Sequence, residues 1–286
     1  MELPDELAIK TDNYEFIIKI IKSTYDFFHS FTFRVGEKSK PCLELYVQLP
    51  VKTDEIEEHY TIALLNNIDA LIDCSTTDIN ENYLRKHSFG LELLLTIDDL
   101  LKRHFPHIRS VKLYDASYMP CNRAYGDTLD LLSYSIALYG KTWYEIKRNA
   151  YIVNPSKRNI YNRKIAQYTS KEFKASISAE TFLNSNIFRS IHVSNHGTYE
   201  FFKTNYDQII NLYKNAQTFP DFFKALRDII PETQRCQIFK TWLQSFIETH
   251  VYVDRNWQYD LYPKKTTDGR RRQTRRRKEY KKRTFV

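Results

Sequence analysis

Glycine, proline and cysteine are scarce in this sequence of 286 residues, which contains only 6, 9 and 4 of them respectively. So few glycines and prolines argue against loop-rich and repeat architectures. We find no internal repeat at the solenoid periods of roughly 20 to 50 residues. No apolar run approaches the roughly 18 residues of a membrane helix, and residues 1–15 are acidic without an apolar signal core. We therefore expect an intracellular, non-secreted protein with no membrane span.

The cysteines stand at positions 42, 74, 121 and 236 and form neither a Cys-x-x-Cys pair nor a zinc-like spacing. We interpret them as reduced, buried side chains. His192 and His196 are spaced like two ligands on one helical face, but Gly197 follows directly and no third ligand is evident. We therefore predict surface histidines and no metal site.

Hydrophobic residues make up 42% of the chain and aromatic residues 15%, which is ample for a packed core. Residues 43–49 alternate apolar and polar side chains and give the clearest strand pattern. Residues 27–35 and about 60–65 also favour strands, and residues 13–22 favour a strand or a short helix. A run of strands therefore opens the chain.

The next stretch predicts a loop, a helix, a strand and a second helix. Apolar residues recur at helical spacing after Ser88, which can cap the helix, and Pro106 forbids its continuation. Residues 110–115 alternate as a strand does. A second apolar helix is predicted from Asp127 to about Leu138, with Gly140 at its end.

Arg85-Lys86-His87-Ser88-Phe89-Gly90 precedes the first of these helices. This segment, in a loop–helix–strand–helix order, resembles the acetyl-CoA-binding half of GNAT N-acetyltransferases. The resemblance implies an α+β fold with a GNAT-like mixed sheet and flanking helices. It also implies that Arg85, Lys86, Ser88, Phe89 and Gly90 bind the pyrophosphate of acetyl-CoA, because unpaired amides at a helix N-terminus attract anions. The alternative is an ordinary basic loop before a core helix.

The same resemblance places two catalytic candidates. Tyr144, with Tyr139 next, would protonate the leaving thiolate, and Asp115, at the end of the predicted strand, would be the general base. The competing interpretations are a core-edge aromatic for Tyr144 and a turn carboxylate for Asp115.

The Leu-rich stretch that ends in Gly140-Lys141-Thr142-Trp143-Tyr144 also resembles uncharacterised proteins of giant viruses of amoebae. That resemblance implies a location in the host cytoplasm, virus factory, nucleus or virion.

After Tyr151 the composition changes. We assign residues 1–153 to the α+β domain, 154–197 to a basic crossover, 198–262 to a helical region and 263–286 to a basic disordered tail. The tail holds twelve Lys/Arg and two acidic residues, a net charge of +10 against +8 for the whole chain. The basic character of the protein therefore belongs to its tail.

Clustered cations of this kind predict binding to nucleic acid or another polyanion, with a nuclear signal or a membrane contact as alternatives. The residues expected to contact phosphates are Arg270, Arg271, Arg272, Arg275, Arg276, Arg277 and Lys278.

Two hypotheses follow. The first is a GNAT-like acyltransferase, active or degenerate, that the tail directs to a polyanion. The second is a non-enzymatic virion or nucleic-acid-binding protein that uses the fold as a scaffold. Ser88 stands where the family has a glycine, which favours the second, because a side chain crowds the pyrophosphate. A parted pair of central strands beside Arg85–Gly90 would favour the first.

Overall fold

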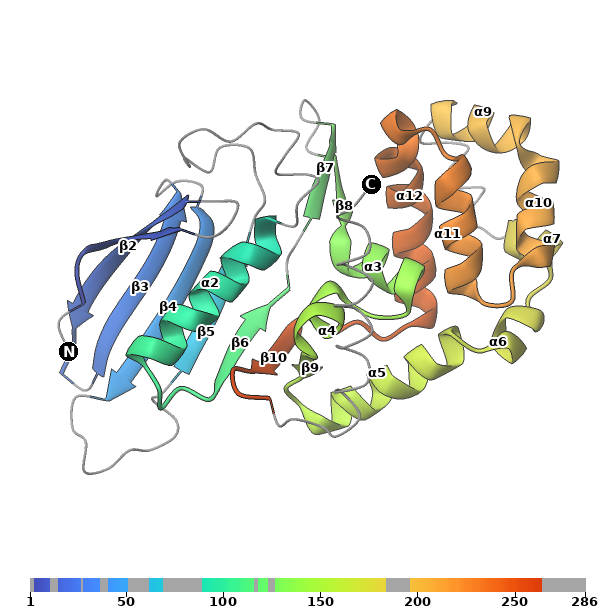
Figure 1. Ribbon diagram of the computed structural model, residues 1–286. Coiled ribbons are helices and arrows are strands. Elements are labelled where there is room, and N and C mark those ends of the chain that lie inside the picture. Colours follow the sequence, from blue (N-terminus) through green and yellow to red (C-terminus); the bar gives the residue numbers. More distant parts are fainter. Residues whose placement is uncertain are drawn as a thin grey trace, which may run out of the picture.

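The computed structural model describes residues 3–10, 15–26, 28–36, 41–50, 62–68, 89–115, 118–122, 127–183 and 196–263. Within these residues an eight-stranded sheet has the order β1-β2-β3-β4-β5-β6-β10-β9 (Figure 1). Its strands are β1 (Glu6–Lys10), β2 (Glu15–Thr24), β3 (Phe28–Gly36), β4 (Pro41–Pro50), β5 (Ile62–Ile68), β6 (Ser110–Tyr114), β9 (Tyr151–Ile152) and β10 (Asn256–Asp260). The fold is therefore α+β with a mixed sheet, as the order of patterns predicted.

The strand predictions at residues 27–35, 43–49 and about 60–65 are confirmed by β3, β4 and β5 within the described residues. Together with β2 these strands form an antiparallel meander, from Ile18 opposite Val35 to Gln48 opposite Ile62, with register shifts at Val35/Gly36 and at Glu44/Leu45. The segment 13–22 was left open between strand and helix, and its described part, residues 15–22, lies in β2, because β-branched residues suit a pleated surface.

One face of the sheet, the inner face, forms the core. Its side chains include Ile18, Phe33, Leu45, Leu113 and Tyr259, each at most 3% exposed. Helix α2 (Phe89–His104) crosses this face (Figure 1). Its apolar stripe is buried, and Phe105, just after its end, packs edge-on against two phenylalanines of β3. The predicted helix before Pro106 and the predicted strand after it are confirmed.

The opposite face of the sheet, the outer face, carries side chains open to solvent. Ile17, Ile21, Leu64 and Tyr114 are 38%, 44%, 39% and 53% exposed. Alternation along each strand produces this difference between the faces, since successive side chains point to opposite sides.

The predicted helix from Asp127 is wrong in its first turn. Asp127–Asp130 is strand β8, which forms a hairpin with β7 (Tyr118–Asn122). Helix α3 (Leu131–Tyr139) begins after Asp130, whose carboxylate accepts a hydrogen bond from the Ser133 backbone N–H at 3.3 Å. A side-chain cap stops the strand pairing and starts the helix at the same residue.

The stretch predicted as a basic crossover, 154–197, contains helices. They are α5 (Pro155–Tyr168), α6 (Lys171–Ala175) and α7 (Ala179–Leu183), and α9 (His196–Thr204) begins near its end. Asn154 caps α5 and Pro155 occupies its first turn. Helices α10 (Tyr206–Asn215), α11 (Phe219–Ile229) and α12 (Glu232–His250) follow within residues 198–262, the region predicted to be helical, which also contains strand β10. Strand β10 then inserts between β6 and β9, so the sheet is completed by residues far beyond 153.

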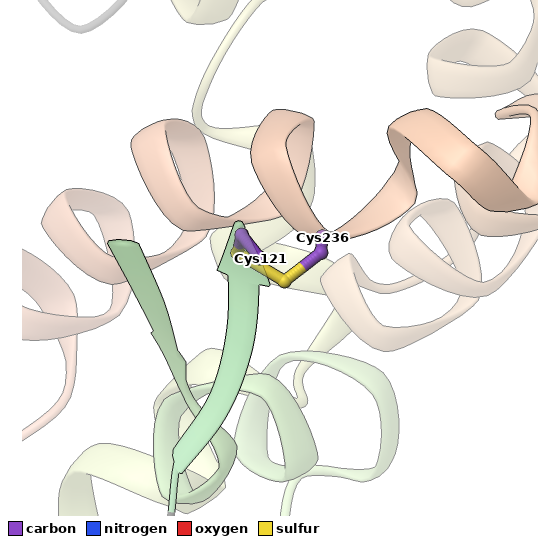
Figure 2. The surroundings of a disulfide bond; sticks show 2 residues. All are labelled: Cys121 and Cys236. Atoms are coloured by element: carbon purple, nitrogen blue, oxygen red, sulfur yellow. A yellow bond between two sulfur atoms is a disulfide. The ribbon is translucent and has the colours of Figure 1, made fainter. Parts of the chain in front are cut away.

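Cys121 on β7 and Cys236 on α12 form a disulfide, with Cα atoms 5.1 Å apart (Figure 2). Our interpretation of these two cysteines as reduced is therefore wrong, because nothing in the sequence indicated that the hairpin and α12 meet. Cys42 and Cys74 lie where no side chain is described. None of the described helices is both long and apolar enough to span a bilayer.

Candidate functional site

The pairing of β5 with β6, near the middle of the sheet, is short, and we call its end at Leu65 and Leu113 the point where the strands part. They are the parallel neighbours among the described strands, and their register covers three pairs, from Ala63 opposite Val111 to Leu65 opposite Leu113. Strand β5 continues to Ile68 along β4. The chain after β6 instead follows β10, since the Asp115 backbone N–H donates to the Arg255 carbonyl at 2.7 Å. Beyond Leu65 and Leu113 each strand keeps its other neighbour, β4 or β10, while the register between β5 and β6 has ended.

A β-bulge lies where the strands part. In the pairing of β5 with β4, Glu44 is opposite Asn67 and Leu45 is opposite Leu65, so Asn66 is an extra residue. An extra residue is left out of the regular ladder and bends its strand. The bulge thus turns β5 at the position where its pairing with β6 ends.

Helix α2 connects the two parallel strands and begins at Phe89, with Gly90 in its first turn. A helix that joins parallel strands runs back along them, which places its N-terminus at the edge where those strands end. Its first amide groups have no partner within the helix. Of the residues predicted to bind the pyrophosphate, Phe89 and Gly90 are described by their backbone, while Arg85, Lys86 and Ser88 lie outside the described residues.

The two predicted catalytic residues lie close together. Asp115 directly follows β6 and is 2% exposed, and Tyr144 on α4 (Trp143–Arg148) is 7% exposed. Burial, and then the negative charge of Asp115, raise the pKa of Tyr144 well above its usual value. The phenol therefore stays protonated, so it can donate a proton or a hydrogen bond but cannot serve as a base.

Helix α4 is held in place by a corner that begins at Gly140. Gly140 has a φ of 63° and ends α3. Thr142 then starts α4 with a capping box, in which its backbone N–H donates to Glu145 Oε2 at 2.7 Å. Tyr161 of α5 donates to the same oxygen at 2.5 Å. The segment Gly140-Lys141-Thr142-Trp143-Tyr144 thus forms a tight turn between α3 and α4. This turn places Tyr144 near the end of β6.

Arg255 ties this end of β6 to α3. Its Nη1 donates to the Asp115 carbonyl at 2.8 Å, and its Nη2 lies 3.4 Å from Asp130 Oδ2. Arg255 comes just before β10 and is 140 residues away from Asp115 in sequence. Neither Arg255 nor Asp130 was predicted, and no local pattern connects them.

A second group of polar side chains lies deeper between α2, α4 and β10. Asp98 is fully buried, accepts a hydrogen bond from Tyr259 at 2.8 Å and pairs with Arg148. The Arg148 guanidinium also stands 4.8 Å from the centre of the Tyr259 ring. Burial raises the pKa of Asp98 to about 6, although Arg148 and Tyr259 act to lower it. In the sequence, the position of Asp98 on the apolar side of the predicted helix was the one indication of this buried polar group.

Metal ligation finds no support here: among the described residues, no cluster of three or more His, Cys, Asp or Glu could hold an ion. His196 begins α9, and His192 lies outside the described ranges. The same is true of the predicted phosphate contacts, Arg270, Arg271, Arg272, Arg275, Arg276, Arg277 and Lys278.

Comparison of the chain with protein-family models, with curated proteins and with solved structures gives no match. The chemistry of this site is therefore inferred from its own geometry.

Proposed function

We propose that the chain is a GNAT-like N-acyltransferase that uses acetyl-CoA. The observation that carries this proposal is the short parallel pairing of β5 with β6, which ends beside the bulge at Asn66. The connections support it as well, because α2 joins the two parallel strands and β10 and β9 extend the sheet antiparallel beyond them. An acetyl-CoA site of this kind needs such an opening for the pantetheine arm.

The residues around the opening suit the parts of that ligand. The backbone of β5 beyond Leu65 is not paired with β6, so its amide groups can bond the amides of the arm. The first amides of α2, at Phe89 and Gly90, suit the pyrophosphate, with Arg85, Lys86 and Ser88 contributed by the preceding loop.

Side-chain and backbone groups of the chain can then assist the transfer of the acetyl group. Acetyl-CoA supplies the activated acyl group, which an acceptor amine attacks. The Asn66 amide at the bulge polarises the carbonyl, and Tyr144 donates its proton to the departing thiolate. Asp115 is 2% exposed, so we assign it to orient Tyr144. The C–N bond forms as the C–S bond breaks, the amine releases its proton to solvent water, and the phenolate left at Tyr144 takes a proton back from water.

A thermal-shift titration of the full chain with acetyl-CoA tests the proposal. A ligand at one hundred times its dissociation constant stabilises a fold by about 2.7 kcal/mol. Gly90→Asp should abolish the shift, because a carboxylate in the first turn repels the pyrophosphate. The same substitution favours the helix itself, so lost binding is not lost folding.

Two controls separate the site from the tail. Gly90→Asn matches the size of the aspartate without its charge and should keep most of the shift. ADP at equal concentration should give little shift, because it lacks the pantetheine arm. Equal shifts of the melting temperature with ADP and acetyl-CoA, or no shift with either, would contradict the acyltransferase proposal.

The second candidate is a non-enzymatic virion or nucleic-acid-binding protein of a large DNA virus. The twelve Lys/Arg of residues 263–286 favour it, since such a run binds phosphate backbones with steep salt dependence. The disulfide favours a virion over a reducing compartment, because such bonds persist at oxidising locations. In this case the tail, and not the parted strands, carries the function.

A further inference from the structure

The outer face of β6, β10 and β9 presents a group of polar and aromatic side chains. Lys112 and Tyr114 come from β6, Asn256 and Gln258 from β10, and Tyr151 from β9. In the register Lys112 is opposite Gln258, which in turn is opposite Tyr151, and Tyr114 is opposite Asn256. Cross-strand neighbours lie about 5 Å apart, so the five form one continuous surface, here called the tyrosine face.

The tyrosine face is open to solvent. Tyr114 is 53% exposed, Lys112 and Asn256 are exposed, and Tyr151 and Gln258 are half-buried. Leu64, opposite Lys112 in β5, extends the surface with an apolar side chain that is 39% exposed. Large side chains held this far out of a folded sheet are available to a partner.

The Tyr151 ring is fixed in position. The Arg158 guanidinium lies 4.4 Å from its centre, its hydroxyl donates to Asp260 Oδ1 at 3.2 Å, and Gln258 Nε2 donates to that hydroxyl at 3.1 Å. A ring fixed in this way loses little conformational freedom when a flat group stacks on it.

The charge around this face is positive. Lys112 lies on this face, and the Arg158 guanidinium lies over the Tyr151 ring. The Arg109 guanidinium lies 5.3 Å from the centre of the Tyr262 ring, at the adjoining end of β10. Two carboxylates lie in this group. Asp260 is bonded to Tyr151, and Asp254 accepts a hydrogen bond from the Asn256 side-chain amide at 3.1 Å and pairs with Lys157. Three residues after β10 the described chain ends at Pro263, and residues 264–286 add twelve Lys/Arg. The tail therefore starts beside the tyrosine face and concentrates anionic polymers there.

We propose that the tyrosine face binds single-stranded nucleic acid. Unpaired bases stack on Tyr114 and Tyr151, while Lys112 and Arg158 contact phosphates. Asn256 and Gln258 each use one amide hydrogen within the protein, for Asp254 and for the Tyr151 hydroxyl, and their second amide hydrogen and carbonyl oxygen can serve base edges. This site adds to the tail-mediated polyanion binding proposed above and differs from it in one respect: stacking requires unpaired bases, whereas a basic tail binds duplex and single strand alike.

The test uses the full chain with fluorescent oligonucleotides, one single-stranded and one duplex of equal length, at low and high ionic strength. Tyr114→Ala should weaken binding of the single strand about tenfold, as loss of one stacked base does, and leave duplex binding unchanged. Tyr114→Phe should bind like the wild type, since it keeps the ring. Lys112→Ala should lower the slope of log affinity against log salt by about one.

Matched controls are Lys19→Ala and Tyr206→Ala. Lys19 is exposed on the outer face of β2, four strands from β6, and Tyr206 is 43% exposed on α10. Neither should change binding. If Tyr114→Ala and Lys112→Ala bind like these controls, the proposal is overturned, even where the tail still binds both oligonucleotides. A dimer that Tyr114→Ala dissociates, with oligonucleotide binding unchanged, would assign the face to a second copy and overturn it as well.

Discussion

Asp98 is fully buried on α2 with the Tyr259 hydroxyl and the Arg148 guanidinium as partners. Burial raises its pKa from 3.8 to about 6, so the folded protein holds this proton more tightly than the unfolded chain does. The protonated Asp98 carboxyl therefore contributes most to the free energy of unfolding below the pKa of the unfolded chain. This contribution is lost as the pH rises through the pKa of the folded protein. A shift of this size corresponds to about 3 kcal/mol.

Urea unfolding between about pH 4 and pH 7 measures this effect. We expect the free energy of unfolding of Asp98→Asn to fall less across this range than that of the wild type, by about 3 kcal/mol. Asp99→Asn is the matched control, because Asp99 is the next residue of α2 and its side chain is 63% exposed. Parallel pH curves for the wild type and Asp98→Asn would contradict the account of this buried group.

Tyr144 offers a test of catalysis that spares the fold. Tyr144→Phe keeps the ring that packs edge-on against Trp143, with centroids 5.0 Å apart, so stability should change by less than about 1 kcal/mol. Loss of a general acid typically costs about a hundredfold or more in rate. Acetyl transfer to a general amine acceptor should therefore fall about a hundredfold, with acetyl-CoA binding retained. An unchanged rate would remove Tyr144 from the mechanism.

At the scale of the element, the corner between α3 and α4 depends on Gly140. Its φ of 63° strains any other residue, and a Cβ there would clash with Thr169 Cγ2. Gly140→Ala should therefore cost about 3 kcal/mol of unfolding free energy, from backbone strain and overpacking together.

Thr169→Ser separates these two causes. It removes Cγ2 and keeps the hydroxyl, which donates to the Ile165 carbonyl at 2.9 Å. In this background Gly140→Ala should cost only the backbone strain, about 1–2 kcal/mol. An equal cost in both backgrounds, measured in urea, would show that the clash is absent.

The Cys121–Cys236 bond joins the β7–β8 hairpin to α12 across 115 residues of chain (Figure 2). Cys121→Ser should lower the free energy of unfolding by about 2–5 kcal/mol, and a reductant should bring the wild type to the same level. Unfolding with and without reductant measures both effects. Alkylation of both thiols in the native, unreduced protein would refute the bond.

Elements that depend on local pattern could be predicted from the sequence. The alternation in residues 43–49 and the helical spacing after Ser88 require no knowledge of the rest of the chain, and both elements formed as expected. The hairpin strand at Asp127–Asp130 was missed because four residues with one apolar side chain, Leu129, are too few to show a period, and pairing with β7 decides their conformation. Tyr144 and Asp115 were both named beforehand, but their proximity follows from the α3–α4 corner.

At the scale of the whole molecule, the helices α5 to α12 form an insertion between two strands of one sheet. Strand β9 ends at Ile152 and its neighbour β10 begins at Asn256. No sequence pattern predicts pairing over such a separation, because it depends on the packing of everything between. Arg255 was missed for the same reason: it reaches Asp115 only once β10 has returned to β6.

The parted strands β5 and β6 carry the central claim, and backbone hydrogen exchange tests it most directly. With acetyl-CoA, exchange should slow in β5 from Asn66 to Ile68 and in the first turn of α2, while β1 to β3 stay unchanged and ADP fails to reproduce the slowing in β5. Slowing confined to residues 264–286, or none at all, would contradict the account and leave the basic tail as the ligand-binding part of the chain.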